Sequence, residues 1–210
     1  MTKVASTSRN SGPPRTAWTV WVILACGLFA AWPSAAFGNE SYKFDQTRST
    51  IAFKVRHLLG TAKGKFAKFS GTIEVDREHP EKSSVVATIQ TASIDTANAK
   101  RDEHLRTADF FSVRQYREIT FKSRRVTQTG PNAGEIAGDL TMHGVTRPIT
   151  LNVQLLGDAK SAADTPTTRW RVTTAPLKRS DFGIGKGAGG EWMIGNDVAV
   201  EIEIEAARAR

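Results

Sequence analysis

Few side chains in this chain could do chemistry, and three histidines are the most notable of them. His57, His104 and His143 lie in three separate stretches, whereas His79 lies in a polar turn. Histidine titrates near neutral pH, so it can act as an acid–base group or as a metal ligand. None of the three has an i, i+4 histidine partner or a His-Glu-x-x-His spacing, so no metal centre is predicted. We expect structural or ligand hydrogen bonding from them, with acid–base catalysis by His143 or His57 as the alternative.

The signatures of other enzyme classes are missing or lie in the wrong context. Gly185-x-Gly187-x-x-Gly190 formally matches a dinucleotide-binding fingerprint, but no strand-to-helix unit surrounds it, so we interpret it as a loop. The sequence contains no Gly-x-Ser-x-Gly elbow and no Walker loop. The single cysteine, Cys26, excludes an intramolecular disulfide framework and a zinc site built on several thiolates.

Cys26 lies in an N-terminal segment that has the layout of a secretory signal. Three basic residues precede the uncharged apolar stretch Ala17–Trp32, which is too short to span a bilayer. Small residues follow, so we predict cleavage after Gly38, with Ala36 as the alternative site, and a mature domain at 39–210. The residues around Cys26 also resemble a lipoprotein box. The apolar residues that continue to Trp32 count against lipidation of Cys26.

Composition and charge narrow the class of protein. The chain has 210 residues, of which 40% are hydrophobic and 24% charged, as expected for one ordinary globular domain. Its net charge is +8, but removing 38 residues leaves 172 and takes away three basic ones, so 26 basic residues then face 21 acidic ones, a net +5. The basic residues are scattered along a secreted chain, which argues against nucleic acid as a partner.

The elements that must position these side chains are mostly strands, because apolar and polar residues alternate from Tyr42 onward. We predict eight strands, the clearest at 149–155 and 198–205, two more at 51–55 and 72–76, and the weaker at 85–94, 119–126, 135–142 and 168–177. No regular strand–helix alternation suggests a parallel sheet. The fold class is therefore all-β and antiparallel, either a sandwich or a barrel.

The segments between the strands give a helix, hairpins and loops. Thr96–Ala108 suits the one helical insertion, while Gly130-Pro131-Asn132 and Gly144 mark hairpin turns. We expect loops at Gly60–Gly64, Gly157–Pro166 and Gly183–Gly190.

Ordered motifs cover essentially the whole mature chain. They are Tyr42-x-Phe44-Asp45, Ser49-x-Ile51-x-Phe53-x-Val55-x-His57, Gly64-x-Phe66-x-x-Phe69-x-Gly71, Ser93-Ile94-Asp95-Thr96, Arg101-Asp102-x-His104-Leu105, Asp109-Phe110-Phe111, Ile119-Thr120-Phe121-x-Ser123, Gly138-x-Leu140-Thr141-x-His143-Gly144-Val145-Thr146, Arg179-x-Asp181-Phe182-Gly183 and Gly195-x-x-Val198. Together they resemble the YceI-like, polyisoprenoid-binding proteins of bacterial periplasms. Ala97 and Asn196 depart from that pattern without affecting the overall resemblance.

The resemblance implies an extended, lipocalin-like, eight-stranded antiparallel barrel in the periplasm that binds, stores or transports a long isoprenoid lipid, of polyprenyl or quinone type. It implies no catalysis and no cofactor other than the bound lipid, and it suggests transient membrane contact and a homodimer as further expectations. The apolar strand faces and the aromatic motif ends then supply the ligand contacts. These are Phe53, Val55, His57, Phe66, Phe69, Ile73, Phe110, Phe111, Phe121, Leu140, His143, Leu151, Phe182, Trp192, Val200 and Ile202.

Three alternatives stay open at this point. An inward-facing residue in a barrel of this size can be packed core instead of ligand wall, so the barrel could be a filled, ligand-free stress-response module. The protein could instead be an enzyme acting on an isoprenoid lipid. Arg101 and Asp102, with Asp95 before them, form either a polar network that pins the helix or, with Arg101, a contact to a ligand head group.

Overall fold

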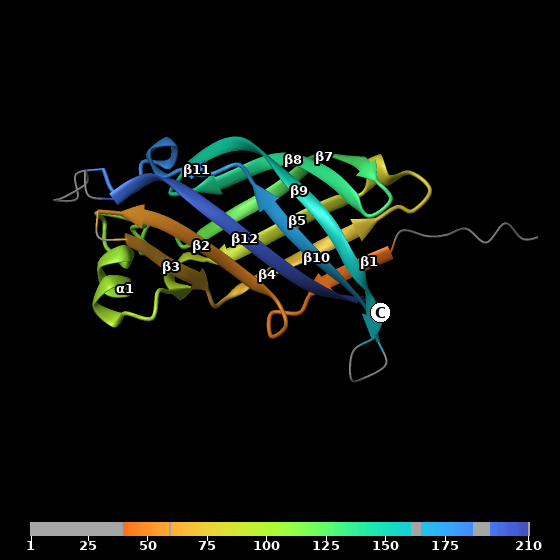
Figure 1. Cartoon of the computed structure of the whole chain (residues 1–210), viewed down its shortest axis with the longest axis horizontal. Helices are drawn as coiled ribbons and strands as arrows, with labels where there is room; N and C mark the ends of the chain where they lie inside the picture. Colours follow the sequence, from red (N-terminus) through yellow and green to blue (C-terminus); the bar gives the residue numbers. More distant parts are fainter. Residues whose placement is uncertain (1–39, 59, 161–164, 187–193, 210) are drawn as a thin grey trace, which may run out of the picture. The chain divides into compact units, whose positions relative to one another are not determined.

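The computed structural model describes residues 40–58, 60–160, 165–186 and 194–209 (Figure 1). The strands are β1 (Glu40–Phe44), β2 (Thr50–His57), β3 (Gly60–Phe66), β4 (Phe69–Val75), β5 (Ser84–Gln90), β6 (Ile94–Asp95), β7 (Glu118–Gly130), β8 (Ala133–Met142), β9 (Val145–Lys160), β10 (Pro166–Thr174), β11 (Leu177–Lys178) and β12 (Ile194–Arg208). The helices are α1 (Ala99–Arg106) and three short 3-10 helices, η1 (Pro80–Lys82), η2 (Thr91–Ser93) and η3 (Arg179–Phe182).

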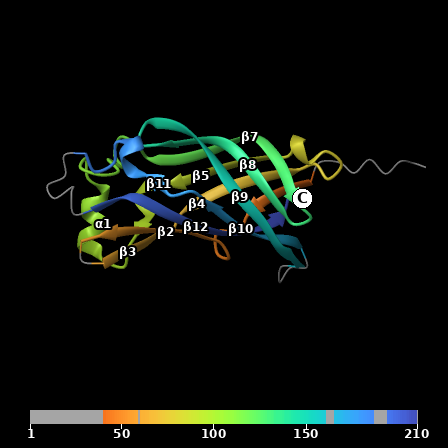
Figure 2. The same cartoon turned by 45° about the horizontal axis from the view of Figure 1, so that its top comes forward.

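The strands form a closed antiparallel barrel with the order β1-β4-β5-β7-β8-β9-β10-β12, and β12 pairs back onto β1 (Figures 1 and 2). The barrel wall has eight sides, here called staves. Three of them are bent, and each of these three is divided into two labelled strands. β1 and β2 pair with successive parts of one edge of β12, β3 continues into β4 after two residues, and β6 follows β5 across the 3-10 turn η2. The structure therefore confirms the predicted all-β, eight-stranded antiparallel fold.

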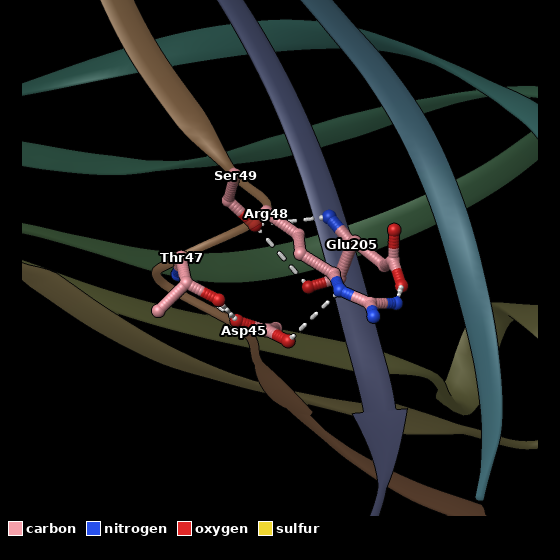
Figure 3. Close-up of polar contacts among 5 residues, drawn as sticks. All are labelled: Asp45, Thr47, Arg48, Ser49 and Glu205. Carbon is pink, nitrogen blue, oxygen red and sulfur yellow. Dashed lines mark hydrogen bonds and ion pairs between the residues drawn. The ribbon is translucent and has the colours of Figure 1, made fainter. Parts of the chain in front are cut away.

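The bend between β1 and β2 is fixed to β12 by hydrogen bonds and ion pairs (Figure 3). Arg48 Nη1 lies 2.7 Å from Glu205 Oε1, and Ser49 Oγ accepts from the Glu205 N–H at 2.9 Å. Asp45 accepts from the hydroxyl and the N–H of Thr47, and these hydrogen bonds keep its pKa below the ordinary value. The polar turn thus aligns both halves of the bent strand with the same partner.

A bulge in β7 preserves the inward-facing pattern along a long strand. The register between β7 and β8 shifts at Ser123 and Arg125, which leaves Arg124 as the extra residue. Ile119 and Phe121 face the interior before the bulge, and Val126 faces it afterwards, because one extra residue inverts the alternation. Arg124 is directed outward and its Nη2 lies 2.7 Å from Asp139 Oδ2.

Every predicted strand is present, and so are the helix and the two hairpin turns. The loop prediction at Gly60–Gly64 is wrong, because these residues form β3 and pair along β2 from His57 to Phe53. The loop expected at Gly157–Pro166 is wrong at both ends, because β9 continues to Lys160, past a bulge opposite Arg169 and Trp170, and β10 begins at Pro166. Residues 161–164 of this prediction lie outside the described residues. Gly183–Lys186 is a turn, and the rest of the loop expected to Gly190 lies outside the described residues.

Candidate functional site: an apolar cavity in the barrel

The barrel encloses a cavity of about 930 Å³. Its wall is made by every second residue of the long strands, since alternate side chains of a strand point to opposite faces. On β9 these are Ile149, Leu151, Val153 and Leu155, and on β12 they are Val198, Val200, Ile202 and Ile204. The interior is therefore not packed solid, and a long apolar molecule has room inside it.

Most of the residues expected to contact a ligand lie on this wall. They are Phe53, Val55, His57, Phe66, Ile73, Phe110, Phe111, Phe121, Leu140, Leu151, Val200 and Ile202. Trp192 lies outside the described residues.

Aromatic rings form one part of the wall near α1. The ring centroids of Phe53 and Phe66 are 5.7 Å apart, and Phe111 stands edge-on to Phe66 at 6.0 Å. The Phe53 ring lies over Gly64, where a Cβ would collide with it and with the methyl group of Thr96. A glycine is required in β3 because it provides the space that the ring occupies.

Phe69 and Phe182 are not among the cavity-lining residues. Phe69 is buried in the core at the start of β4, and Phe182 in η3 is 2% exposed. Both side chains are used for packing, so we leave them out of the proposed ligand contacts.

His143 also lies away from the cavity, in the turn between β8 and β9. Both central residues of this turn have positive φ, 52° at His143 and 74° at Gly144, as a two-residue hairpin turn of type I′ requires. His143 Nδ1 is 3.0 Å from the Phe182 carbonyl oxygen, and the ring packs on Tyr116 with centroids 4.4 Å apart. The contacts of His143 are those of a residue that joins the hairpin to η3.

The end of the cavity beside α1 is basic. Arg101, His57, His104 and Arg179 contribute to its lining there. Arg179 donates to the carbonyl oxygens of Ile184, Ile194 and Gly195, and so ties η3 to the start of β12.

Arg101 belongs to a hydrogen-bonded network at the start of α1. Its Nε donates to Thr96 Oγ1 and its Nη2 to the Thr96 carbonyl, both at 2.8 Å. The buried Asp102 carboxylate accepts from the N–H and the hydroxyl of Thr96, at 2.9 and 2.6 Å. Asn98 caps the helix by accepting from the Arg101 N–H. The polar network considered from the sequence is therefore present for Arg101 and Asp102, whereas Asp95 accepts from the Ala97 N–H and lies 4.0 Å from Lys65 instead.

The opposite end of the cavity carries charges that neutralise one another. Asp76 accepts from the N–H groups of Glu78 and His79, which keep its pKa below the ordinary value. Arg77 Nε lies 3.0 Å from Glu40 Oε2. Burial opposes ionisation of Glu40, but hydrogen bonds from Tyr42 and Arg77 outweigh it and leave the Glu40 pKa lowered.

Among the described residues, no group of three or more His, Cys, Asp and Glu side chains is arranged to hold a metal ion. His104 pairs with Asp109, Nε2 to Oδ2 at 3.3 Å, and its ring meets the edge of Phe110. In the described ranges of the chain, no helix is long and apolar enough to cross a membrane.

Sequence reasoning missed the full extent of the wall and named Arg101 only as the alternative contact to a ligand head group. The same alternation that selected Leu151 and Val200 also marks Ile149, Val153 and Val198, so that signal was available. Trp170 and Val172 on β10 line the cavity as well. No local pattern in the sequence shows that Arg101 reaches the cavity, because this depends on how α1 lies against β3 and β6.

A closed eight-stranded antiparallel barrel around one apolar cavity defines a lipocalin-like protein. The pattern that describes the YceI-like domain matches residues 42–206, so the chain belongs to the YceI-like family.

Curated relatives support this assignment. A UPF0312 protein of Ectopseudomonas mendocina is 39% identical over 163 residues, which cover 74% of this chain and 85% of the relative. A UPF0312 protein of Vibrio cholerae is 37% identical over 166 residues, covering 77% and 87%.

Solved structures show the same fold. Burkholderia cenocepacia BcnA matches with a TM-score of 0.69 at 24% identity, covering 77% of this chain and 98% of BcnA. The YceI protein of Campylobacter jejuni matches with a TM-score of 0.64 at 30% identity, covering 71% and 86%. A polyisoprenoid-binding domain from Saccharophagus degradans matches with a TM-score of 0.60 at 20% identity, covering 80% and 98%.

Proposed function

We propose that this protein binds one long-chain isoprenoid lipid inside the barrel and stores or transports it in the periplasm without chemical change. The observation that carries this proposal is the apolar cavity of about 930 Å³ along the inward faces of the strands. The fold shared with the polyisoprenoid-binding domain of Saccharophagus degradans supports an isoprenoid as the occupant.

The cavity volume sets the size of the tail. A cavity of about 150 Å³ holds one benzene ring, so 930 Å³ corresponds to roughly six rings, or about 35 carbons. That is a tail of roughly seven isoprene units. Each buried methylene-sized group contributes about 0.8 kcal/mol, so a partly enclosed tail still offsets the cost of association.

The direct test is to extract the purified protein with organic solvent and identify the lipid by mass spectrometry. The stripped protein is then titrated with geranylgeraniol and with a long-chain quinone. Ligand at 100 times its Kd adds about 2.7 kcal/mol of stability, which is roughly a 5–10 °C rise in Tm for a domain of this size.

The same experiment separates the alternatives that the sequence left open. Absence of lipid together with an unchanged Tm would favour a ligand-free module. A product released from the added lipid would favour an enzyme, with His57 on the cavity wall as the first residue to substitute.

Periplasmic location is the second part of the proposal, and it rests on the signal layout of residues 1–38. Intact-mass measurement of the periplasmic protein should give a chain that starts at Asn39. A start at Cys26 with an added lipid mass would replace free periplasmic location with a membrane tether.

Exchange of the lipid with a membrane requires an exposed entrance to the cavity, and we propose that this entrance lies beside Leu58. Leu58 is 67% exposed, lines the cavity and follows β2 directly. Arg56 and Lys63 are exposed on the same hairpin and would attract anionic lipid. Co-sedimentation with phosphatidylglycerol vesicles should fall for Leu58→Ser and stay unchanged for Val86→Ser, which alters an exposed residue on β5. The expected homodimer stays a prediction, to be checked by light scattering.

A further inference from the structure

We propose that one edge of β3 binds an extended, acidic peptide segment of another protein by strand addition. This inference goes beyond lipid binding, because it concerns the backbone edge of a strand and not the cavity. The side of Gly60–Gly64 that faces away from β2 is called the free edge of β3 below.

β3 is paired along its whole length on one side only. Gly60–Phe66 pair with β2, which separates β3 from β12 (Figures 1 and 2). On its other side β3 pairs with the two residues of β6, and the last pair joins Lys65 to Asp95. Among the described residues, no strand pairs with Gly60–Gly64 on that side. The closed wall of the barrel therefore contains a short stretch of unpaired strand edge.

The chain leaves β3 directly after β6. Ala97 has a φ of 57°, in the left-handed region, and Asn98 then caps α1 by accepting from the Arg101 N–H. This backbone conformation is not that of a strand. Because the chain turns here, β6 does not continue alongside the free edge.

The hairpin geometry determines which backbone groups face the free edge. β2 ends at His57 and β3 begins at Gly60, so this closing pair exchanges hydrogen bonds, and so does every second pair after it. The N–H and C=O groups of Thr61 and Lys63, which lie in the other pairs, point away from β2. Lys65 is next in this series, and its partner on that side is Asp95, as this assignment requires. Thr61 and Lys63 therefore present donors and acceptors to an incoming strand.

The charge of the hairpin favours an acidic partner. Thr61 and Lys63 are exposed, and so is Arg56 opposite Thr61. Lys54 pairs with Glu201 at 2.6 Å, whereas Lys63 forms no ion pair with any described residue. A second copy of β3 would bring the same basic side chains against these, and like charges on paired strands are destabilising. Acidic side chains on the outward face of an added strand would instead lie beside Lys63 and stabilise the pairing.

The probe is a short peptide with blocked ends in which glutamate alternates with valine, and a lysine–valine peptide of equal length is its control. With the glutamates facing outward, the valines face inward like Ala62, which lines the cavity. Titration at low ionic strength should show binding of the glutamate peptide and much weaker binding of the lysine peptide. Methylating alternate backbone nitrogens of the glutamate peptide should abolish binding for one set and preserve it for the other, because a strand pairs with one neighbour through alternate residues.

Substitutions on the free edge test the same contact from the protein. Thr61→Pro removes one N–H from the free edge and spares the ladder with β2, so affinity for the glutamate peptide should fall about tenfold. Thr61→Val keeps the N–H and should bind like wild type. Lys63→Glu should also weaken binding, and it carries the test if Thr61→Pro fails to fold. Lys43→Glu is the matched control, because it makes the same charge change at an exposed position of β1, which is paired on both edges.

Three results would overturn the proposal. Equal binding of the two peptides, or an equal loss in Lys43→Glu and Lys63→Glu, would show that an acidic strand is not selected at this edge. A dimer that Thr61→Pro converts to a monomer in light scattering would identify the occupant as a second copy of this chain. Binding to phosphatidylglycerol vesicles should be unchanged in Thr61→Pro, and an equal loss of vesicle and peptide binding would identify the edge as a membrane contact instead.

Discussion

Substituting Val153 by phenylalanine tests whether the barrel interior is an open cavity or a packed core. Val153 lies on the cavity wall in β9, between Gly134 on β8 and Val172 on β10. The glycine has no side chain, so a ring at position 153 has room on that side. The ring would then extend into the space that the lipid tail is proposed to occupy.

The two descriptions of the interior predict opposite signs for the change in stability. In a packed core, overpacking costs about 1–3 kcal/mol. In an open cavity, phenylalanine adds about four apolar carbons at roughly 0.8 kcal/mol each, an upper bound near 3 kcal/mol. Since the ring would still border the lumen, we expect about half of that, a gain of roughly 1–2 kcal/mol in the stripped protein.

The affinity for lipid should fall in the Val153→Phe protein, although its stability should rise. Displacing one isoprene unit of about five carbons forfeits up to roughly 4 kcal/mol, so affinity for a long-chain isoprenoid quinone, whose tail fills the cavity, should fall between tenfold and about a thousandfold. The assays are chemical denaturation of the stripped protein and titration with that quinone.

Gln154→Phe is the matched control, because Gln154 is the next residue on β9 and is exposed. It should leave lipid affinity unchanged. A Val153→Phe protein that loses 1–3 kcal/mol of stability, a range of about the size known for overpacked cores, while still binding lipid like wild type would refute the open-cavity reasoning.

Three further predictions concern the turns and the aromatic wall. Asp45, with its pKa lowered by hydrogen bonds from Thr47, stabilises the fold above the unfolded carboxyl pKa of about 3.9, and this contribution is lost as pH falls through the folded pKa. Asp45→Asn should therefore lower the Tm at pH 7, and its difference from wild type should shrink in melts below about pH 4; a constant difference would contradict this. Gly64→Ala should lower the Tm because the new Cβ meets the Phe53 ring, and adding Phe53→Leu should recover part of the loss in the same melts. His143→Asn, which tolerates positive φ but loses the ring contact with Tyr116, should lower the Tm less than His143→Val, which should be destabilised by about 1–3 kcal/mol, and neither variant should lose lipid affinity; a loss of affinity in the asparagine variant would return His143 to the ligand site.

The alternation of apolar and polar residues predicted the barrel well, because most staves have one face on the cavity and one face in solvent. Residues 198–205 alternate without interruption, and they form the part of β12 that lines the cavity. The count of eight strands also agrees with the eight staves. The breaks between β1 and β2 and between β3 and β4 could not be predicted, because they arise where the staves bend to change pairing partners.

The wrong predictions have physical causes that local sequence patterns do not show. Gly60–Gly64 has weak strand propensity, yet it forms β3 because β2 provides a complete ladder and the Phe53 ring needs the space at Gly64. In the candidate site, alternation identified wall residues such as Leu151, while Phe182 and His143 were selected by motif and are used for packing and for a turn. The place of Arg101 depends on tertiary contacts of α1.

The closure of the barrel has a consequence for the order in which the chain can fold. β1 pairs with β12, from Tyr42 with Arg208 to Phe44 with Ala206, so the ring is completed by residues more than 160 positions apart in sequence. The other neighbours in the ring are mostly hairpins, which form from local contacts. Contacts of such high sequence separation slow folding, because the entropy of closing the long loop is lost before any pairing compensates for it. A chain delivered from its N-terminus would hold β1 and β2 with an unpaired edge until β12 arrived, and ring closure would then be the final and slowest step of folding.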